Sequence, residues 1–312
     1  MDPPPGGILP GSAYRRVPRP PACGQPRTVD SGARLGSWLG VRIKVPSFRL
    51  LRGRDLALHA AAVTFYSGIA VVPIALLGIW LTSLIAGADR IRRLTGRTIA
   101  ALPGEIGAPR ALAALIDAGL HLTPMLALAS LLPATLYGEG LRRAFVSIYR
   151  HTGESLVGWR GRLLWLPLLA ATPALLLGLF LALPITSALW VRGGWWSVLG
   201  VVLSFLAVWL LLTPVVVWVF RYVAPGRPPW LPTVLIGSFT AANLSGFLHG
   251  FVLFCSLPLN LGTPFGGFDA IGGTVAVGLW LYVFHTIVLV GFAATHAVKP
   301  HLTDESPRAD VT

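Results

Sequence analysis

Long runs without charged residues dominate the pattern of the chain. The first, AAAVTFYSGIAVVPIALLGIWLTSLIA at residues 60–86, contains no Asp, Glu, Lys or Arg. About 20 apolar residues, rising 1.5 Å each, cross a hydrocarbon core of roughly 30 Å. A buried helix of a soluble protein would show a polar face, whereas this run offers only scattered hydroxyl groups. The pattern therefore predicts a membrane-spanning helix over 60–86.

Five further apolar runs follow it, at residues 112–137, 163–190, 196–220, 231–257 and 271–298. The first of these five is interrupted by Asp117 and His121. We therefore expect its membrane portion to begin near Leu120, with 91–118 as an amphipathic connector. The predicted fold class is an all-α, polytopic membrane protein with six transmembrane helices.

Composition and charge support this class and orient it. The chain is 54% hydrophobic and 12% charged, against about 25% charged residues in typical soluble domains. Its net charge is +13, which could indicate nucleic acid as a partner. However, 19 of the 25 Lys and Arg residues fall on one side if the N-terminus is cytoplasmic. We therefore expect both termini inside (N-in/C-in), no nucleic-acid partner, and anionic lipid headgroups as partners at the cytoplasmic face.

The ends of the chain differ from its apolar middle. Residues 1–34 are rich in Pro, Gly and Arg and predict a disordered cytoplasmic tail, and 299–312 predict a second one. Residues 35–58 mix apolar and basic side chains, which suits either a basic interfacial segment or a plain basic linker. No apolar stretch typical of a signal peptide precedes Ala60. The two cysteines, Cys23 and Cys255, predict neither a disulfide framework nor a cysteine metal site.

Four motifs, in a fixed order, carry a resemblance to a known family. They are LHAAAVTFYSGIAVVPIALL at 58–77, LRRAFVSIYR at 141–150, RYVAPGRPPWLPTVLIGSFTAANL at 221–244 and FGGFDAIGGTVAVGLWLYVFHTIVLVGFAATHAV at 265–298. Together they resemble the YihY/BrkB family of inner-membrane proteins over about residues 50–298. The resemblance implies a multi-pass protein of the bacterial cytoplasmic membrane. Some members are labelled virulence factors, and others are linked to envelope integrity or lipid export.

The chain also departs from the family pattern. Many relatives have Asn where this chain has Ser147, and Phe265-Gly266 stands in for Tyr-Gly. The last helix reads Gly291-Phe292-Ala293 where relatives often have Gly-Ala-Glu, so the carboxylate at the membrane edge is missing. A mechanism that requires this carboxylate is not expected here.

Polar side chains within apolar runs are costly in a membrane and are therefore candidates for function. The candidates for a polar intramembrane cavity are Tyr66, Ser67, Asn243, His249 and His285. His285 could shuttle protons near neutral pH. The alternative for these residues is ordinary hydrogen bonding and packing between helices.

A second candidate group lies in the predicted inner loop. Its arginines, Arg142, Arg143, Arg150, Arg160 and Arg162, could bind the phosphates of lipid headgroups at the cytoplasmic leaflet. The alternative is that these charges only set the topology.

A ribonuclease label also accompanies the family, and the sequence does not support it. Metal-assisted phosphodiester hydrolysis needs clustered carboxylate or histidine ligands. The acidic residues Asp117, Glu139, Glu154 and Asp269 lie in different loops, and no phosphate-binding glycine motif occurs. We therefore expect no enzymatic activity, no catalytic residues, no metal and no cofactor.

Two functions remain open from the sequence. The first is transport or organisation of an envelope lipid through a cavity between the first, fifth and sixth predicted spans. The second is a non-transporting scaffold that binds envelope-assembly partners or a second copy of the chain. A cavity open to one leaflet would favour the first, and a solidly packed bundle would favour the second.

Overall fold

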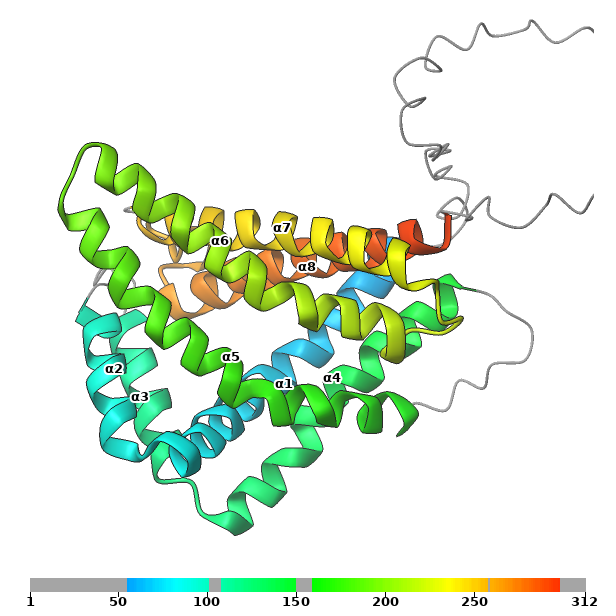
Figure 1. Ribbon diagram of the computed structural model, residues 1–312, viewed down its shortest axis with the longest axis horizontal. Coiled ribbons are helices and arrows are strands. Elements are labelled where there is room, and N and C mark those ends of the chain that lie inside the picture. Colours follow the sequence, from blue (N-terminus) through cyan, green and yellow to red (C-terminus); the bar gives the residue numbers. More distant parts are fainter. Residues whose placement is uncertain (1–54, 101–107, 150–158, 258, 298–312) are drawn as a thin grey trace, which may run out of the picture. The chain divides into compact units, whose positions relative to one another are not determined.

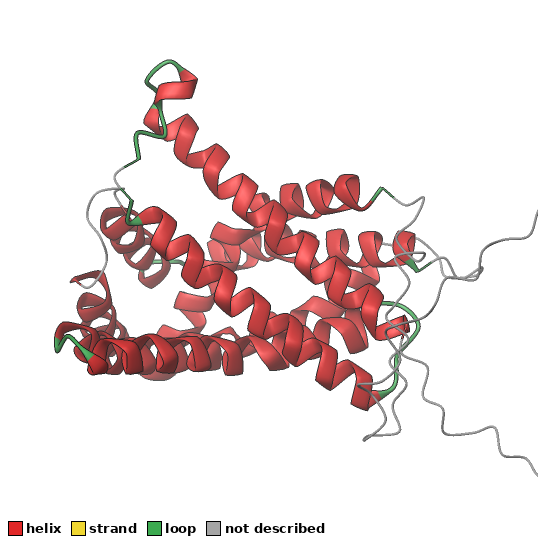
Figure 2. Ribbon diagram, turned by 90° about the horizontal axis from the view of Figure 1, so that it is seen from above, coloured by secondary structure: helices red, strands yellow, loops and turns green. Residues whose placement is uncertain are grey.

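A computed structural model describes residues 55–100, 108–149, 159–257 and 259–297, all within one compact unit of the chain. Over these ranges every regular element is a helix and none is a strand (Figure 2). The expected tails at 1–34 and 299–312, nearly all of the basic segment 35–58, and Arg150 lie outside the described residues.

The helices follow one another with short connections (Figure 1). In chain order they are α1 Leu56–Ala86, α2 Ala88–Ala100, α3 Ala108–Leu120, α4 Pro124–Ile148, α5 Trp159–Val191, α6 Trp195–Trp218, the π-helical turn η2 Val219–Val223, α7 Trp230–Cys255, the 3₁₀ turn η3 Thr263–Phe265 and α8 Asp269–Ala297. The Asp55 side chain caps α1 by accepting from the Leu58 amide.

Five of the described helices, α1, α5, α6, α7 and α8, are long and apolar enough to cross a membrane. They correspond to the predicted spans 60–86, 163–190, 196–220, 231–257 and 271–298, with ends shifted by a few residues. Over the described residues the all-α prediction is therefore confirmed, with five helices as candidates for membrane spans. The predicted count of six is not confirmed, because α4 is not among the helices that are long and apolar enough to cross a membrane.

The expected interruption of the apolar run over 112–137 is confirmed, close to the predicted start of its membrane portion near Leu120. The structure divides the run into α3, which ends at Leu120, and α4, which begins at Pro124. Thr123 caps α4, with its hydroxyl accepting from the Leu126 amide at 3.3 Å, and proline suits the first turn of a helix. Thr123 and Pro124 mark the start of α4 within the apolar run.

The expected amphipathic connector consists of α2 and α3. Each presents one apolar face to the protein: Ile91 and Ile116 are buried with Ile79 of α1 and Phe180 of α5. The exposed face of α2 carries arginines. This arrangement explains why the connector is amphipathic while the spans are apolar on all sides.

The main core forms where α1, α4, α5 and α8 pack together and where η2 meets them. Three buried phenylalanines from separate elements lie at its centre: the Phe145 and Phe292 ring centroids are 4.4 Å apart, and Phe220 lies 6.2 Å from Phe292. Phe292 and Ala293 are buried in this cluster, which accounts physically for the absence of a carboxylate there.

Candidate functional site

A histidine at the centre of the bundle joins three helices. His285 of α8 is 1% exposed. Its Nδ1 lies 3.1 Å from the Thr64 hydroxyl of α1, and its Nε2 lies 3.0 Å from the Tyr137 hydroxyl of α4. We call Thr64, Tyr137 and His285 the polar triad.

The directions of these hydrogen bonds follow from the threonine. The Thr64 hydroxyl donates to the Ala60 carbonyl at 2.8 Å, so its oxygen accepts from Nδ1–H of His285. Nε2 then accepts from the Tyr137 hydroxyl. One neutral tautomer satisfies every group of the triad, so the triad stabilises the packing of α1, α4 and α8 without a buried charge.

Tyr66 and Ser67 lie on the same helix as Thr64, near the triad in sequence. The Tyr66 ring packs on Gly140 of α4, where an added Cβ would lie 2.6 Å from the ring. Ser67 is buried in the bundle. The structure thus places both residues at helix contacts, where the motif around them sets the approach of α1 to α4.

A groove lies beside the triad, between α1, the C-terminal part of α7 and the N-terminal half of α8. Its volume is about 880 Å³, and most of its surface is apolar. It is lined by Thr64, Gly68 and Val71 of α1, by Phe251, Val252, Phe254 and Cys255 of α7, by Leu257, Leu259 and Leu261, and by residues of α8 between Asp269 and Leu281. Thr64 lines the groove and is also a member of the polar triad, so the triad lies next to the groove.

Asn243 and His249 do not join this site. Asn243 is exposed on α7, and its amide donates to the Phe239 carbonyl at 2.8 Å. His249 lies toward α6, with Nε2 at 3.0 Å from the Ser204 hydroxyl and Nδ1 at 2.8 Å from the Ser245 carbonyl. The structure therefore gives these two residues separate surroundings rather than one cavity.

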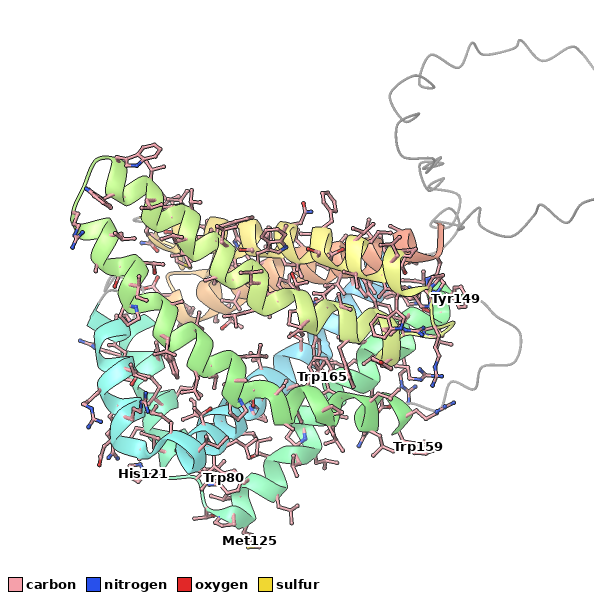
Figure 3. All side chains as sticks on the ribbon, viewed as in Figure 1. Trp80, His121, Met125, Tyr149, Trp159 and Trp165 are labelled. Carbon is pink, nitrogen blue, oxygen red and sulfur yellow. The ribbon has the colours of Figure 1, made fainter. Side chains whose placement is uncertain are left out.

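A cluster of charges lies near the ends of α4 and α5 that flank residues 150–158, where Figure 3 labels Tyr149 and Trp159. Glu139 of α4, which is 7% exposed, accepts from Arg143 at 2.7 Å and from Arg162 of α5 at 2.6 Å. We call these three residues the ion cluster. It ties α4 to α5, so both arginines already have an anionic partner inside the protein.

The other predicted headgroup contacts differ in exposure. Arg142 is 6% exposed, and its Nη1 donates to the carbonyl of Val223 at the end of the π-helical turn at 2.9 Å. Arg160 is exposed at the start of α5. Headgroup binding therefore stays a prediction, with Arg160 exposed to a ligand, while Arg142 supports the end of η2.

Sequence reasoning missed three residues of these features: Thr64, Tyr137 and, as a partner, Glu139. The i, i+4 spacing of Glu139 and Arg143 on one helix could have indicated their ion pair. No local sequence pattern indicates the triad, because Tyr137 and Thr64 lie 148 and 221 residues from His285 along the chain.

Within the ranges that the structure covers, no group of three His, Cys, Asp or Glu side chains could hold a metal ion.

Removing the tyrosine hydroxyl should weaken the triad measurably. We expect Tyr137→Phe to lower the free energy of unfolding by about 1 kcal/mol, within the range for hydrogen bonds between membrane helices, because His285 Nε2 loses its donor. Denaturation in mixed micelles, combined with His285→Phe in a double-mutant cycle, gives the coupling energy. Tyr282→Phe removes a hydroxyl from a tyrosine of α8 outside the triad and serves as the control. A coupling energy of zero would contradict the hydrogen bond.

Comparison with known proteins identifies the family. None of the curated proteins and none of the solved structures matches this chain. The model of the family described as virulence factor BrkB matches residues 47–311, which include every helix described above. The motifs that resemble this family lie in α1, at the end of α4, at the start of α7 and in α8. The chain is therefore a membrane protein that belongs to the virulence factor BrkB family.

Proposed function

We propose that this protein moves or organises a lipid of the envelope at the cytoplasmic membrane, with six spans and both termini in the cytoplasm. The sixth span in this proposal is α4. Its 25 residues extend roughly 37 Å, enough to cross the hydrocarbon core. Glu139, Arg142 and Arg143 occupy its last third or so, and each of them bonds to other protein groups.

The distribution of basic residues supports the orientation. With α4 counted as a span, 19 of the 25 Lys and Arg residues fall on the side of the N-terminus. The arginines of α2 and α3 lie on the other side. The apolar faces of α2 and α3 pack on the protein, and Arg90, Arg92, Arg93 and Arg110 are exposed at its surface.

The groove is the observation that carries the lipid function. Small-molecule sites have volumes of about 300–1,000 Å³ and mainly apolar linings with a few polar groups, and the groove fits this description. It lies between three of the five helices that are long and apolar enough to cross a membrane. An apolar groove between such helices is accessible to lipid chains. Among the described residues, we find no comparable feature that favours the scaffold function.

Filling the groove should stop lipid movement. We expect liposomes containing the wild-type protein to exchange labelled phospholipid between leaflets, and Gly68→Phe to reduce this rate to that of protein-free liposomes. Gly68 lines the groove, and an added Cβ there meets no atom within 4 Å, so this position has room for the start of a larger side chain.

Asn243→Leu is the matched control, because it changes an exposed side chain outside the groove and should leave the rate unchanged. Wild-type protein that moves no lipid, with or without a proton gradient, would contradict transport and favour the scaffold. Equal rates for wild type and Gly68→Phe would show that the lipid takes another path.

A further inference from the structure

The groove carries a formal charge at the first residue of α8. Among the described residues that line the groove, Asp269 is the charged one. Its side chain is exposed, and no Lys, Arg or His of the described residues forms an ion pair with it. The groove therefore offers an anion to a cationic ligand.

Apart from Asp269, the lining of the groove presents mainly apolar groups to a ligand. Its two threonines, Thr64 and Thr274, donate their hydroxyl protons to the carbonyls of Ala60 and Ala270 in their own helices, at 2.8 and 2.7 Å. Their methyl groups are therefore the parts best suited to contact a ligand. The remaining lining is mainly Val, Leu, Phe, Ala and Gly, which suits hydrocarbon chains.

The length of the groove matches one leaflet. Along α8 the lining runs from Asp269 to Leu281, roughly 18 Å at 1.5 Å per residue. Half of a hydrocarbon core is about 15 Å thick. A lipid whose headgroup lies at Asp269 would therefore place its chains along the groove as far as the polar triad, and no farther.

We propose that the groove binds one aminophospholipid, with its primary ammonium group at Asp269 and its acyl chains along α1, α7 and α8. This inference rests on the proposed lipid function and names the class of lipid. A cationic end group complements the Asp269 carboxylate, whereas an anionic headgroup such as phosphatidylglycerol would bring a second negative charge to it. Phosphatidylethanolamine is the probe that carries the required ammonium group.

Native mass spectrometry of the full-length protein in detergent tests the headgroup. Phosphatidylethanolamine and phosphatidylglycerol with identical acyl chains are added in turn, and the lipid-bound fraction is measured. We expect wild type to prefer phosphatidylethanolamine by about two- to fivefold, the range for an ion pair exposed to solvent, and Asp269→Asn to bind both equally. Equal binding of the two lipids by wild type, or an unchanged preference in Asp269→Asn, would overturn the proposal.

A thiol in the groove gives an independent measurement. Cys255 lines the groove, so in a Cys23→Ser background it is the remaining cysteine of the chain. Its rate of reaction with a maleimide should fall when phosphatidylethanolamine is added, and fall less with phosphatidylglycerol. A rate that neither lipid changes would overturn binding in the groove.

Two glycines provide a matched pair for the position of the lipid. An added Cβ at Gly273, which lines the groove, meets no atom within 4 Å, and one at Gly246 of α7, outside the groove, lies 3.7 Å from Phe205. We expect Gly273→Leu to lose bound phosphatidylethanolamine and Gly246→Leu to retain it. Loss in both variants, or in neither, would contradict binding in the groove.

The binding and transport experiments distinguish the aminophospholipid site from the proposed lipid transport. Binding that depends on Asp269, in a protein that moves no lipid in liposomes, would support the aminophospholipid site and overturn transport. Lipid movement that Gly68→Phe abolishes, in a protein whose binding ignores Asp269, would support transport and overturn the headgroup assignment.

Discussion

Replacing both Arg143 and Arg162 by methionine is expected to lower the free energy of unfolding by about 3 kcal/mol. The change leaves Glu139, which is 7% exposed, as a buried carboxylate without its two ion-pair partners. Removing the partner of a buried charge costs about 3–5 kcal/mol. We expect the lower end of this range because the arginine side chains are 50% and 34% exposed, so water reaches the cluster, and because Arg142 lies one turn away.

The order of the variants tests whether the unpaired charge causes the loss. Glu139→Gln should cost less than the double arginine variant, since the two arginines it leaves are partly solvated. Adding Glu139→Gln to the double variant should recover part of the lost stability, because the unpaired charge is then absent. Denaturant titration in mixed micelles, followed by circular dichroism, measures all three. A triple variant less stable than the double variant would show that Glu139 is held by contacts other than its charge.

The membrane helices were predictable because an uncharged apolar run of about 20 residues is typical of a membrane span and rare in soluble domains. The interruption of the run at 112–137 was predictable from Asp117 and His121, and the structure places the break just before Thr123 and Pro124, which cap and begin α4. Helix ends in a membrane chain are therefore better predicted from caps and prolines than from the limits of an apolar run.

Which face of each span meets the protein was not predictable. In a soluble protein the polar face marks the solvent, but lipid is as apolar as the interior of the bundle. Asn243 and His285 are both polar residues in apolar helices, yet the first is exposed and the second is 1% exposed. The partners of His285 come from α1 and α4, so only the three-dimensional packing identifies the triad.

Gly138→Ala is expected to destabilise the protein by about 2 kcal/mol, although alanine favours helices over glycine by up to about 1 kcal/mol. An added Cβ at Gly138 would lie 2.6 Å from the carbonyl oxygen of Gly161, where α4 and α5 cross. A backbone atom cannot move aside as a flexible side chain does, so the helices must separate, and overpacking of this kind costs about 1–3 kcal/mol. Thermal unfolding in detergent measures the change.

The same crossing predicts how two substitutions combine. In Gly161→Ala, the added Cβ would lie against the carbonyl oxygen of Gly138. Either alanine alone therefore forces α4 and α5 apart. Once they are apart, the second alanine has room, and the double variant should lose clearly less than the sum of the two losses. Gly246→Ala, whose Cβ makes an ordinary 3.7 Å contact, should leave stability nearly unchanged. Additive losses at Gly138 and Gly161 would mean that each alanine disturbs its own surroundings. In that case the loss would not come from the separation of α4 and α5. The hydrogen bond of 2.6 Å from Arg162 to Glu139, which joins the two helices, would then not be strained either.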